Sequence, residues 1–153
     1  MRCWMMKMGS CRSEGVLGMK IMLDKGAKVS RAHPYDAGLD LYAMEGGVLR
    51  PGYHGVFDTG VHVQIPEGWY GEIRSRSGMM VIHHVVTDGT IDSHYNGSIR
   101  VKLFNLGSRE YRVNAGDKIA QLVIVPCLLP ELEIVDSLEE TDRGDGGFGS
   151  TGR

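Results

Sequence analysis

The chain has 153 residues, which fits a single domain. Its formal net charge is −2, so it lacks the positive field that favours binding to a nucleic-acid polymer. No apolar run reaches the ~18–20 residues of a membrane-spanning helix. Three cysteines without a C-x-x-C pair predict neither a zinc site nor a disulfide framework. We therefore expect a reduced, cytoplasmic protein with no nucleic-acid or membrane partner.

The two ends of the chain differ in composition from its middle. Residues 1–18 match neither helix nor strand periodicity and lack the apolar stretch of a signal peptide, so they are interpreted as a flexible extension. After Pro130 the chain becomes acidic and then glycine-rich. We expect a β domain over residues 19–136 and a C-terminal arm over residues 137–153.

Short apolar stretches alternate with turn signals along the β domain, which predicts an all-β barrel or sandwich. One segment, "SGMMVIHHVV", predicts a short helix with Ser77 as its N-cap. The expected strands lie, in chain order, in "MKIMLD", "GVFDTGVHVQI", "WYGEIRSR", "GSIRVKLFNLG", "EYRVNAGDKIAQLVIVPCLL" and "LEIV".

Polar residues interrupt two apolar strands. In "AGLDLYA", alternation turns Leu39 and Leu41 inward and Asp40 to the other face. In "GDKIAQLVI", Gln121 interrupts a buried strand, and a buried amide needs hydrogen-bond partners. Taken alone, each residue also fits a bland role, as a turn aspartate or an edge-strand glutamine.

The stretch "RSRSG", residues 74–78, places two arginines and two serines at a strand end. Arg76 offers a planar fork of donors that fits phosphate oxygens, and Ser77 adds a hydroxyl where a helix begins. This pattern indicates an anion site, with an ordinary solvated strand end as the alternative.

The stretch "DGTIDSHYNGSI", residues 88–99, combines a turn signal with a carboxylate and an aromatic ring. The letters "YNG" indicate a hairpin, because Asn and Gly tolerate positive φ, and its backbone groups would read the edge of a base. Asp92 is expected at a strand end, where it would act as a general base on water. Tyr95 would stack under a flat sugar or base. The alternative is a structural hairpin with a turn-capping Asp.

The C-terminal stretch "RGDGGFGSTGR" is rich in glycine but contains Phe148, which has nothing local to bury against. Concave backbone N–H groups bind anions, although the P-loop pattern is absent. We interpret the stretch as a lid over a flat, phosphorylated ligand, with a disordered tail as the alternative.

Taken in this order, the five stretches resemble the five motifs of the trimeric deoxyuridine triphosphatases (dUTPases). "AGLDLYA" is similar to the first motif, "RSRSGM" to the second, "GTIDSHYNG" to the third, "GDKIAQLV" to the fourth and "RGDGGFGSTG" to the fifth, over about Met19 to Gly152. The resemblance implies a jelly-roll-like β-barrel with a flexible glycine-rich arm, assembled as a homotrimer. It also implies Mg²⁺-assisted hydrolysis of dUTP to dUMP and pyrophosphate, which limits uracil in DNA and supplies dUMP for dTMP synthesis.

The resemblance assigns roles to particular residues. Asp92 would activate water for attack on the α-phosphorus, Tyr95 would pack against the deoxyribose, and the backbone around Gly89 to Gly97 would recognise uracil. Asp40 would support the metal through water, or an arginine, while Mg²⁺ would arrive mainly with the nucleotide. The phosphate chain and the waters on its metal would be held by Arg76, Ser77, Gly78 and Gln121.

The resemblance also assigns roles to the C-terminal arm, and the sequence differs from the third motif at one position. Phe148 would cover uracil, and the β and γ phosphates would meet the arm at Arg143, Gly149, Ser150 and Thr151. His94 stands where the third motif often has an acidic residue or glycine, so its titration is expected to add pH dependence near neutrality.

Two other functions fit parts of the pattern. A dCTP deaminase relative shares the fold, but the complete fifth motif argues against it. A nucleotide-sensing regulator would need an inserted segment, and none is visible in the sequence. The intact Asp92 favours catalysis.

Overall fold

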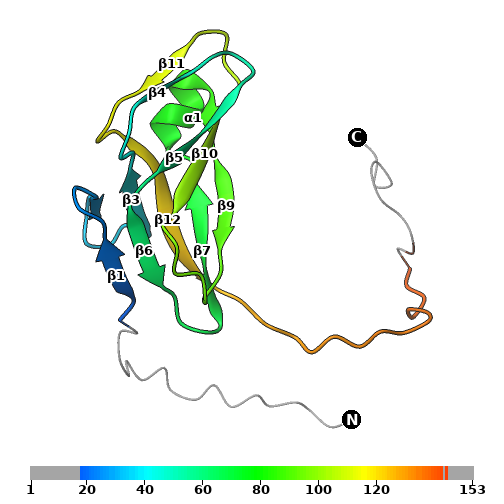
Figure 1. Cartoon of the computed structure of the whole chain (residues 1–153). Coiled ribbons are helices and arrows are strands. Elements are labelled where there is room, and N and C mark those ends of the chain that lie inside the picture. Colours follow the sequence, from blue (N-terminus) through cyan, green and yellow to red (C-terminus); the bar gives the residue numbers. More distant parts are fainter. Residues whose placement is uncertain (1–17, 143, 145–153) are drawn as a thin grey trace.

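The computed structural model describes residues 18–142 and 144, and nearly all of the regular structure there is β-strand (Figure 1). One short helix, α1 (Ser77–His83), lies between β7 and β8. This confirms the predicted all-β, jelly-roll-like barrel with one short helix. The strands are β1 (Lys20–Leu23), β2 (Val29–Ser30), β3 (Gly38–Tyr42), β4 (Gly47–Leu49), β5 (His54–Asp58), β6 (Val61–Gln64), β7 (Trp69–Arg74), β8 (Val85–Val86), β9 (Asp88–Ile91), β10 (Arg100–Asn105), β11 (Tyr111–Val113) and β12 (Lys118–Pro126).

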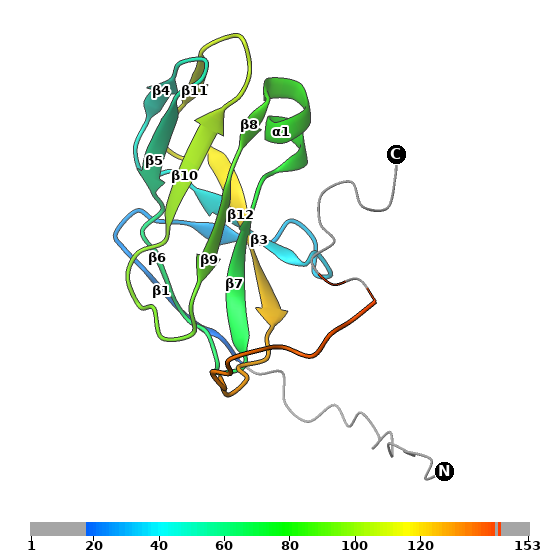
Figure 2. The same cartoon turned by 90° about the vertical axis from the view of Figure 1, so that its right-hand side faces the viewer.

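The strands of the described residues form four antiparallel sheets around one core. A five-stranded sheet has the order β2-β3-β12-β7-β9, and a three-stranded sheet has the order β5-β10-β8. Two further pairs, β1-β6 and β4-β11, complete the barrel. Figure 2 shows β5 and β10 to the left of β7 and β9. Consecutive elements therefore often lie in different sheets, as the crossovers of a jelly roll require.

Strand alternation sets which side chains form the core. On β10, Val101 and Leu103 are fully buried while Arg100 and Lys102 are exposed, as the sequence pattern predicts. The same core also receives side chains from the five-stranded sheet and from both smaller pairs: Leu41, Leu49, Val61, Val63, Ile73, Ile91, Val113 and Leu122. This continuous core fixes the positions of the strand ends that carry polar residues.

Strand β12 is the centre of the larger sheet, because it pairs with β3 on one side and β7 on the other. Its register places Gln121 directly between Asp40 of β3 and Arg74 of β7. The first, second and fourth predicted motifs therefore meet on one sheet, although they are far apart in the sequence.

Several local expectations are wrong. Arg76, in an extended conformation, is the N-cap of α1, so Ser77 is its first residue. The cap has no side-chain hydrogen bond, and the Arg76 carbonyl accepts the first helical bond, from Met80 N–H. Cys127 is partly exposed just past the end of β12. The stretch "LEIV", residues 132–135, is not a strand.

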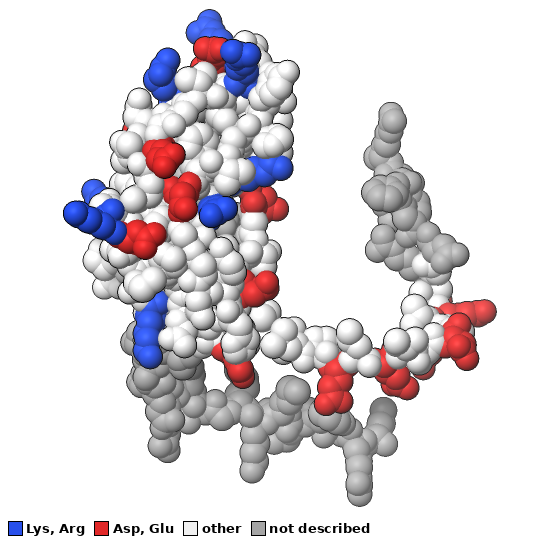
Figure 3. Space-filling model, viewed as in Figure 1, with Lys and Arg blue, Asp and Glu red and all other residues white. Residues whose placement is uncertain are grey.

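Residues 127–142 follow β12 without helix or strand and run away from the barrel in Figure 1. The segment has six acidic residues and no lysine or arginine, and Figure 3 shows its acidic side chains spaced along the chain. Large apolar side chains are exposed between them: Leu128, Leu129, Leu132, Ile134 and Leu138. "LEIV" lacks a strand because no neighbouring strand of the described chain lies beside it to complete a ladder.

Within residues 18–142 and 144, none of the helices has the length and apolar character needed to cross a membrane.

Candidate active site

A hollow of about 960 Å³ opens at the end of the five-stranded sheet where β7 meets α1. Five residues predicted from the sequence line this hollow: Asp40, Arg76, Ser77, Gly78 and Gln121. Their meeting follows from the register of β12 between β3 and β7. Residues in or beside β3, β7, β12 and α1 thus face one open space that is large enough for a nucleotide's phosphate chain.

Asp40 is the most buried charged group in the hollow, with 9% of its surface exposed. Lys118 Nζ donates to its Oδ2 at 2.7 Å, and Arg76 Nε lies 3.4 Å from its Oδ1. The hydrogen bond to Asp40 raises the pKa of Lys118 above its ordinary value, so this lysine stays charged. Two cations therefore compensate the buried carboxylate, as a buried charge requires.

This arrangement gives Asp40 a structural task. Arg76 also donates from Nη1 to the Lys118 carbonyl at 3.4 Å, so its guanidinium is held from two sides while about a third of the side chain stays exposed. The expected support of an arginine by Asp40 is present in the geometry. An oriented guanidinium at the rim of the hollow can bind phosphate oxygens in a fork.

Lys118 is a site residue that the sequence reasoning missed. It opens the strand "KIAQLVIV", where a lysine is ordinarily a solvated strand end. Its partner Asp40 lies on the neighbouring strand β3, two residues before Tyr42, with which Lys118 pairs beside a register shift between Lys118 and Ala120. No single-sequence pattern marks such an irregular pairing, since it depends on tertiary register.

Gln121 has the partners that a half-buried amide needs. Its Nε2 donates to the Ser75 carbonyl at 3.3 Å, and its side chain lies flat against Gly38. A Cβ at Gly38 would lie 3.0 Å from Gln121 Cδ and closer still to its Oε1. Glycine at this position therefore leaves the space in which Gln121 reaches the hollow.

Ser75 is a second residue whose role the sequence did not reveal. Its hydroxyl donates to the Thr87 carbonyl at 2.9 Å and accepts from the Thr87 N–H at 2.8 Å. This double contact joins the end of β7 to the start of β9. Thr87 lines the hollow, and within the described part of the chain its buried Oγ1 has no hydrogen-bond partner.

Acidic side chains also line the hollow, and Glu72 is paired with Arg74 at 3.2 Å. Across residues 18–142 and 144, no group of three or more His, Cys, Asp or Glu side chains is placed to hold a metal ion. Asp40 is already engaged by two cations. The donor set fits a Mg²⁺ ion that is carried by a triphosphate and its waters better than one held in a protein cage.

Asp92, Tyr95 and Gly89 do not line this hollow. Asp92 follows β9 at a strand end, as expected, and is exposed. The opposite end of β9, Asp88, is at the hollow, and at ~3.3 Å per residue a strand of this length separates Asp88 from Asp92 by about 13 Å. A single copy of the chain therefore holds the two halves of the predicted site apart.

Residues 92–99 do not form the regular hairpin that "YNG" predicted. Strands β9 and β10 belong to different sheets and share no ladder, and neither Asn96 nor Gly97 has positive φ. Instead, a Cβ at Gly97 would lie 2.6 Å from Tyr95 Cζ, so glycine is needed for ring packing. The Tyr95 hydroxyl then donates to the Ser98 carbonyl at 3.0 Å. We call residues 92–99 the crossover loop.

The remaining predicted residues belong to the arm. Arg143, Phe148, Gly149, Ser150 and Thr151 lie outside the described residues.

The described sites together offer a hollow with oriented cationic and amide donors, and a separate loop with a carboxylate beside an aromatic ring. The first can bind a chain of phosphates, and the second can position water and a flat ring.

Comparison with known proteins identifies the class. The dUTPase family model matches residues 24–152. The deoxyuridine 5'-triphosphate nucleotidohydrolase of Clostridium tetani is 40% identical over 144 residues, covering 92% of this chain and 99% of the relative. The corresponding protein of Rabbitpox virus is 44% identical over 123 residues, covering 80% and 84%. The chain belongs to the dUTPase family.

Solved structures agree in fold. The dUTPase of Staphylococcus bacteriophage 80alpha, solved with dUPNHPP, is 34% identical with a TM-score of 0.81 and covers 90% of this chain and 99% of its own. A mutant dUTPase from phage phi11 of S. aureus, described as coordinating a structural Mg(II) ion, is 33% identical with a TM-score of 0.73 and covers 80% of this chain and 99% of its own.

Proposed function

We propose that the protein hydrolyses dUTP to dUMP and pyrophosphate. Family membership supports this activity, and the observation in the structure that carries it is the hollow in which Asp40 and Lys118 orient Arg76. A triphosphate needs oriented cations and amide donors, and the hollow supplies both. We further propose that the β domain spans residues 19–136, and that the protein acts in the cytoplasm.

In the proposed reaction, Asp92 accepts a proton from water, and the water oxygen attacks the α-phosphorus. The bond from that phosphorus to the bridging oxygen of the β-phosphate breaks, and pyrophosphate leaves. Arg76, Ser77, Gly78 and Gln121 bind the phosphate oxygens. Bound Mg²⁺ would supply neutralising charge to the triphosphate, with Gln121 and Asp40 reaching it through water.

The crossover loop would hold the nucleoside. The backbone from Gly89 in β9 to Gly97 in the loop would read uracil, and the Tyr95 ring would pack against the deoxyribose. The hydrogen bond to Ser98 and the close contact with Gly97 support this role, because they fix the ring on an exposed surface. From the arm, Phe148 would cover the base, and the phosphates would meet Arg143, Gly149, Ser150 and Thr151.

We propose that the working enzyme is a homotrimer with sites shared between copies. The separation of Asp92 from the hollow supports this, because the two lie at opposite ends of β9 in one copy. The exposed apolar side chains of residues 127–142, such as the 99% exposed Ile134, also call for a protein surface to cover them. A second copy would supply both the missing half-site and that cover.

A nucleotide panel tests the function. Pyrophosphate release is measured with Mg²⁺ and, separately, dUTP, dCTP, dTTP and UTP. The proposal expects turnover of dUTP, with the other three far slower, because the loop reads the base and Tyr95 excludes a 2′-hydroxyl. Comparable turnover of dCTP or UTP would overturn the specificity, and absence of pyrophosphate from dUTP would overturn the activity.

A further inference from the structure

The His62 side chain on β6 bridges two distant parts of the chain. Its Nδ1 lies 2.9 Å from the carbonyl oxygen of Asn96 in the crossover loop, and its Nε2 lies 3.3 Å from Asp24 Oδ1, just past β1. A carbonyl and an ionised carboxylate can only accept hydrogen bonds, so both ring nitrogens donate. The geometry is that of an imidazolium, with only 18% of the side chain exposed.

The crossover loop is anchored separately at its base. Ser98 Oγ donates to Asp58 Oδ1, Thr59 Oγ1 donates to the Ile99 carbonyl at 2.7 Å, and Ile99 N–H donates to the Val61 carbonyl at 2.8 Å. These contacts fix the end of the loop. His62 instead reaches Asn96, between Tyr95 and the glycine on which that ring packs.

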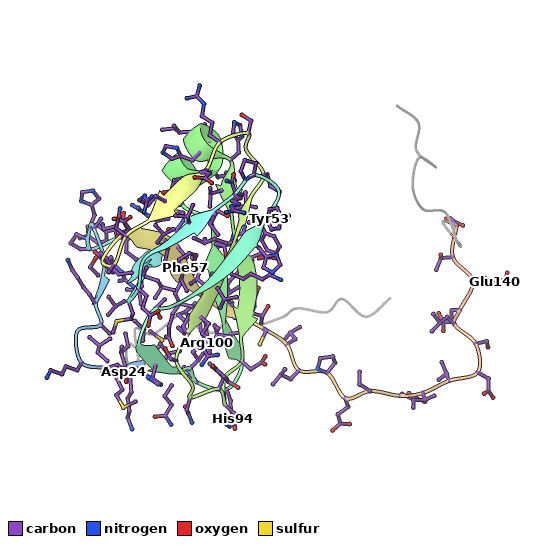
Figure 4. The ribbon with its side chains drawn as sticks, turned by 45° about the horizontal axis from the view of Figure 1, so that its top comes forward. Asp24, Tyr53, Phe57, His94, Arg100 and Glu140 are labelled. Carbon is purple, nitrogen blue, oxygen red and sulfur yellow. The ribbon has the colours of Figure 1, made fainter. Side chains whose placement is uncertain are left out.

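The charges around His62 favour its protonated form. The hydrogen bond to Asn96 and then that to Asp24 raise its pKa above the ordinary value, and the charge of Asp58 adds to this. Arg100 lies 3.8 Å from Asp58 and partly offsets that carboxylate. Figure 4 labels Asp24 and Arg100 in the lower part of the barrel, and Asp24 follows β1, the strand that pairs with β6.

His94, which the sequence suggested as the source of pH dependence, belongs to the crossover loop itself but makes a different contact. It pairs with Glu67 at 3.4 Å, and both side chains are at least 80% exposed. An ion pair this exposed contributes little to the position of the loop. His62 is the histidine that contacts the backbone of the loop.

We propose that His62 is a positioning residue for the nucleobase: its doubly bonded ring ties the tip of the crossover loop, at Asn96, to Asp24. This inference rests on the proposed function of the loop in reading uracil. Deprotonation leaves a lone pair on Nε2 facing the Asp24 carboxylate, which releases the ring from β1. The raised pKa means that the tie is complete below the ordinary pKa of 6.5 and is lost as pH rises through the folded value.

The kinetic test compares His62→Ala, His62→Gln and the exposed control His54→Gln. Loss of one positioning hydrogen bond predicts a rise in KM for dUTP of roughly three- to ten-fold in His62→Ala at pH 6.5, with a smaller change in kcat. In wild type, KM should rise between pH 6.5 and 8.5 because the tie is lost. His62→Gln keeps an N–H for Asn96, so its KM at pH 6.5 should be close to that of wild type. It should not show the rise of KM with pH. His54→Gln should retain that rise.

Two results would overturn the proposal: an unchanged KM in His62→Ala, or a wild-type pH profile in His62→Gln. Asp24→Asn supplies a second variant, and should move the rise of KM to lower pH because a negative charge is removed. If Asp24→Asn leaves the profile in place, the imidazole is not tied to that carboxylate.

A readout without turnover separates this inference from the proposed function. Nitrogen NMR of the histidine rings should show both His62 nitrogens protonated at pH 6.5, and amide exchange at Asn96 and Gly97 should be faster in His62→Ala than in His54→Gln. If wild type does not hydrolyse dUTP, the function fails while these measurements still test the tie. A neutral His62 ring at pH 6.5 overturns the tie alone.

Discussion

Asp92 follows the last residue of β9 and has an exposed side chain. This position leaves the carboxylate accessible to water while the strand fixes its backbone. Asp92→Asn should lower kcat by roughly 10²–10⁴-fold, because general-base assistance is lost. Nucleotide binding should persist, since Arg76 and Gln121 remain. Steady-state turnover with equilibrium binding of dUTP checks both parts, and near-normal turnover would remove Asp92 from its role.

Lys118 and Arg76 together compensate the negative charge of the buried Asp40 carboxylate. Lys118→Met should draw Arg76 toward the buried carboxylate and away from phosphate, so KM for dUTP should rise and the melting temperature should fall. Lys28→Met is the matched control, because Lys28 and Lys118 both lie over the Tyr42 ring, at 4.7 and 5.8 Å from its centroid. The ion pairs of Asp40 involve only Arg76 and Lys118 among the described residues. Equal behaviour of the two variants would contradict the argument.

Asp58 is the acid-sensitive anchor of the crossover loop. Its pKa is lowered first by the Ser98 hydroxyl, then by the Gly60 N–H, with a smaller effect of Arg100. A lowered folded pKa means that the stabilisation is complete above the ordinary value of 3.8 and is lost as pH falls through the folded value. The free energy of unfolding of Asp58→Asn should therefore fall below that of wild type at pH 6, and the difference should shrink toward pH 3. A pH-independent difference would contradict this cause.

At the scale of elements, alternation predicts the strands well wherever one face is buried. The pattern of Val101 and Leu103 against Arg100 and Lys102 is periodic enough to identify β10, and its burial follows that pattern residue by residue. The short strands β2 and β8 have two residues each and carry no period. Their existence depends on pairing with β3 and β10, which local sequence cannot specify.

The types of residue in the site could be predicted from the sequence, but only some of the contacts between them could. Arg76 and Gln121 carry chemistry that a sequence displays, and the register of β12 brings them together. Lys118 and Ser75 were missed because their roles depend on cross-strand partners. The hairpin expected from "YNG" was wrong in mechanism, since Gly97 makes room for a ring and does not adopt positive φ.

The C-terminal arm makes an element-scale prediction of its own. Removal of residues 143–153 should sharply lower dUTP turnover, because the donors proposed for the β and γ phosphates are lost. The barrel should keep its melting temperature, since its core is formed by strands from β3 to β12. Turnover and thermal unfolding of the shortened chain are the measurements. Full activity after the deletion would contradict a lid role.

At the scale of the whole molecule, the proposed active site is divided between two regions of the chain. The hollow with Arg76 and the loop with Asp92 lie at opposite ends of β9. Asp88 lines the hollow, whereas Asp92, about 13 Å further along the strand, does not. In the proposed homotrimer, assembly of copies would be part of the chemistry, and a monomeric form should be inactive even when folded.

Mixing inactive variants tests this division most directly. Asp92→Asn and Arg76→Ala chains, co-expressed with different tags at equal levels, are purified as mixed assemblies and assayed on dUTP. If each site takes Asp92 from one copy and Arg76 from another, random assembly restores about a quarter of wild-type sites. The double variant mixed with wild type should also retain about a quarter of them. No recovery in the first mixture, with about half of the activity retained in the second, would contradict the account.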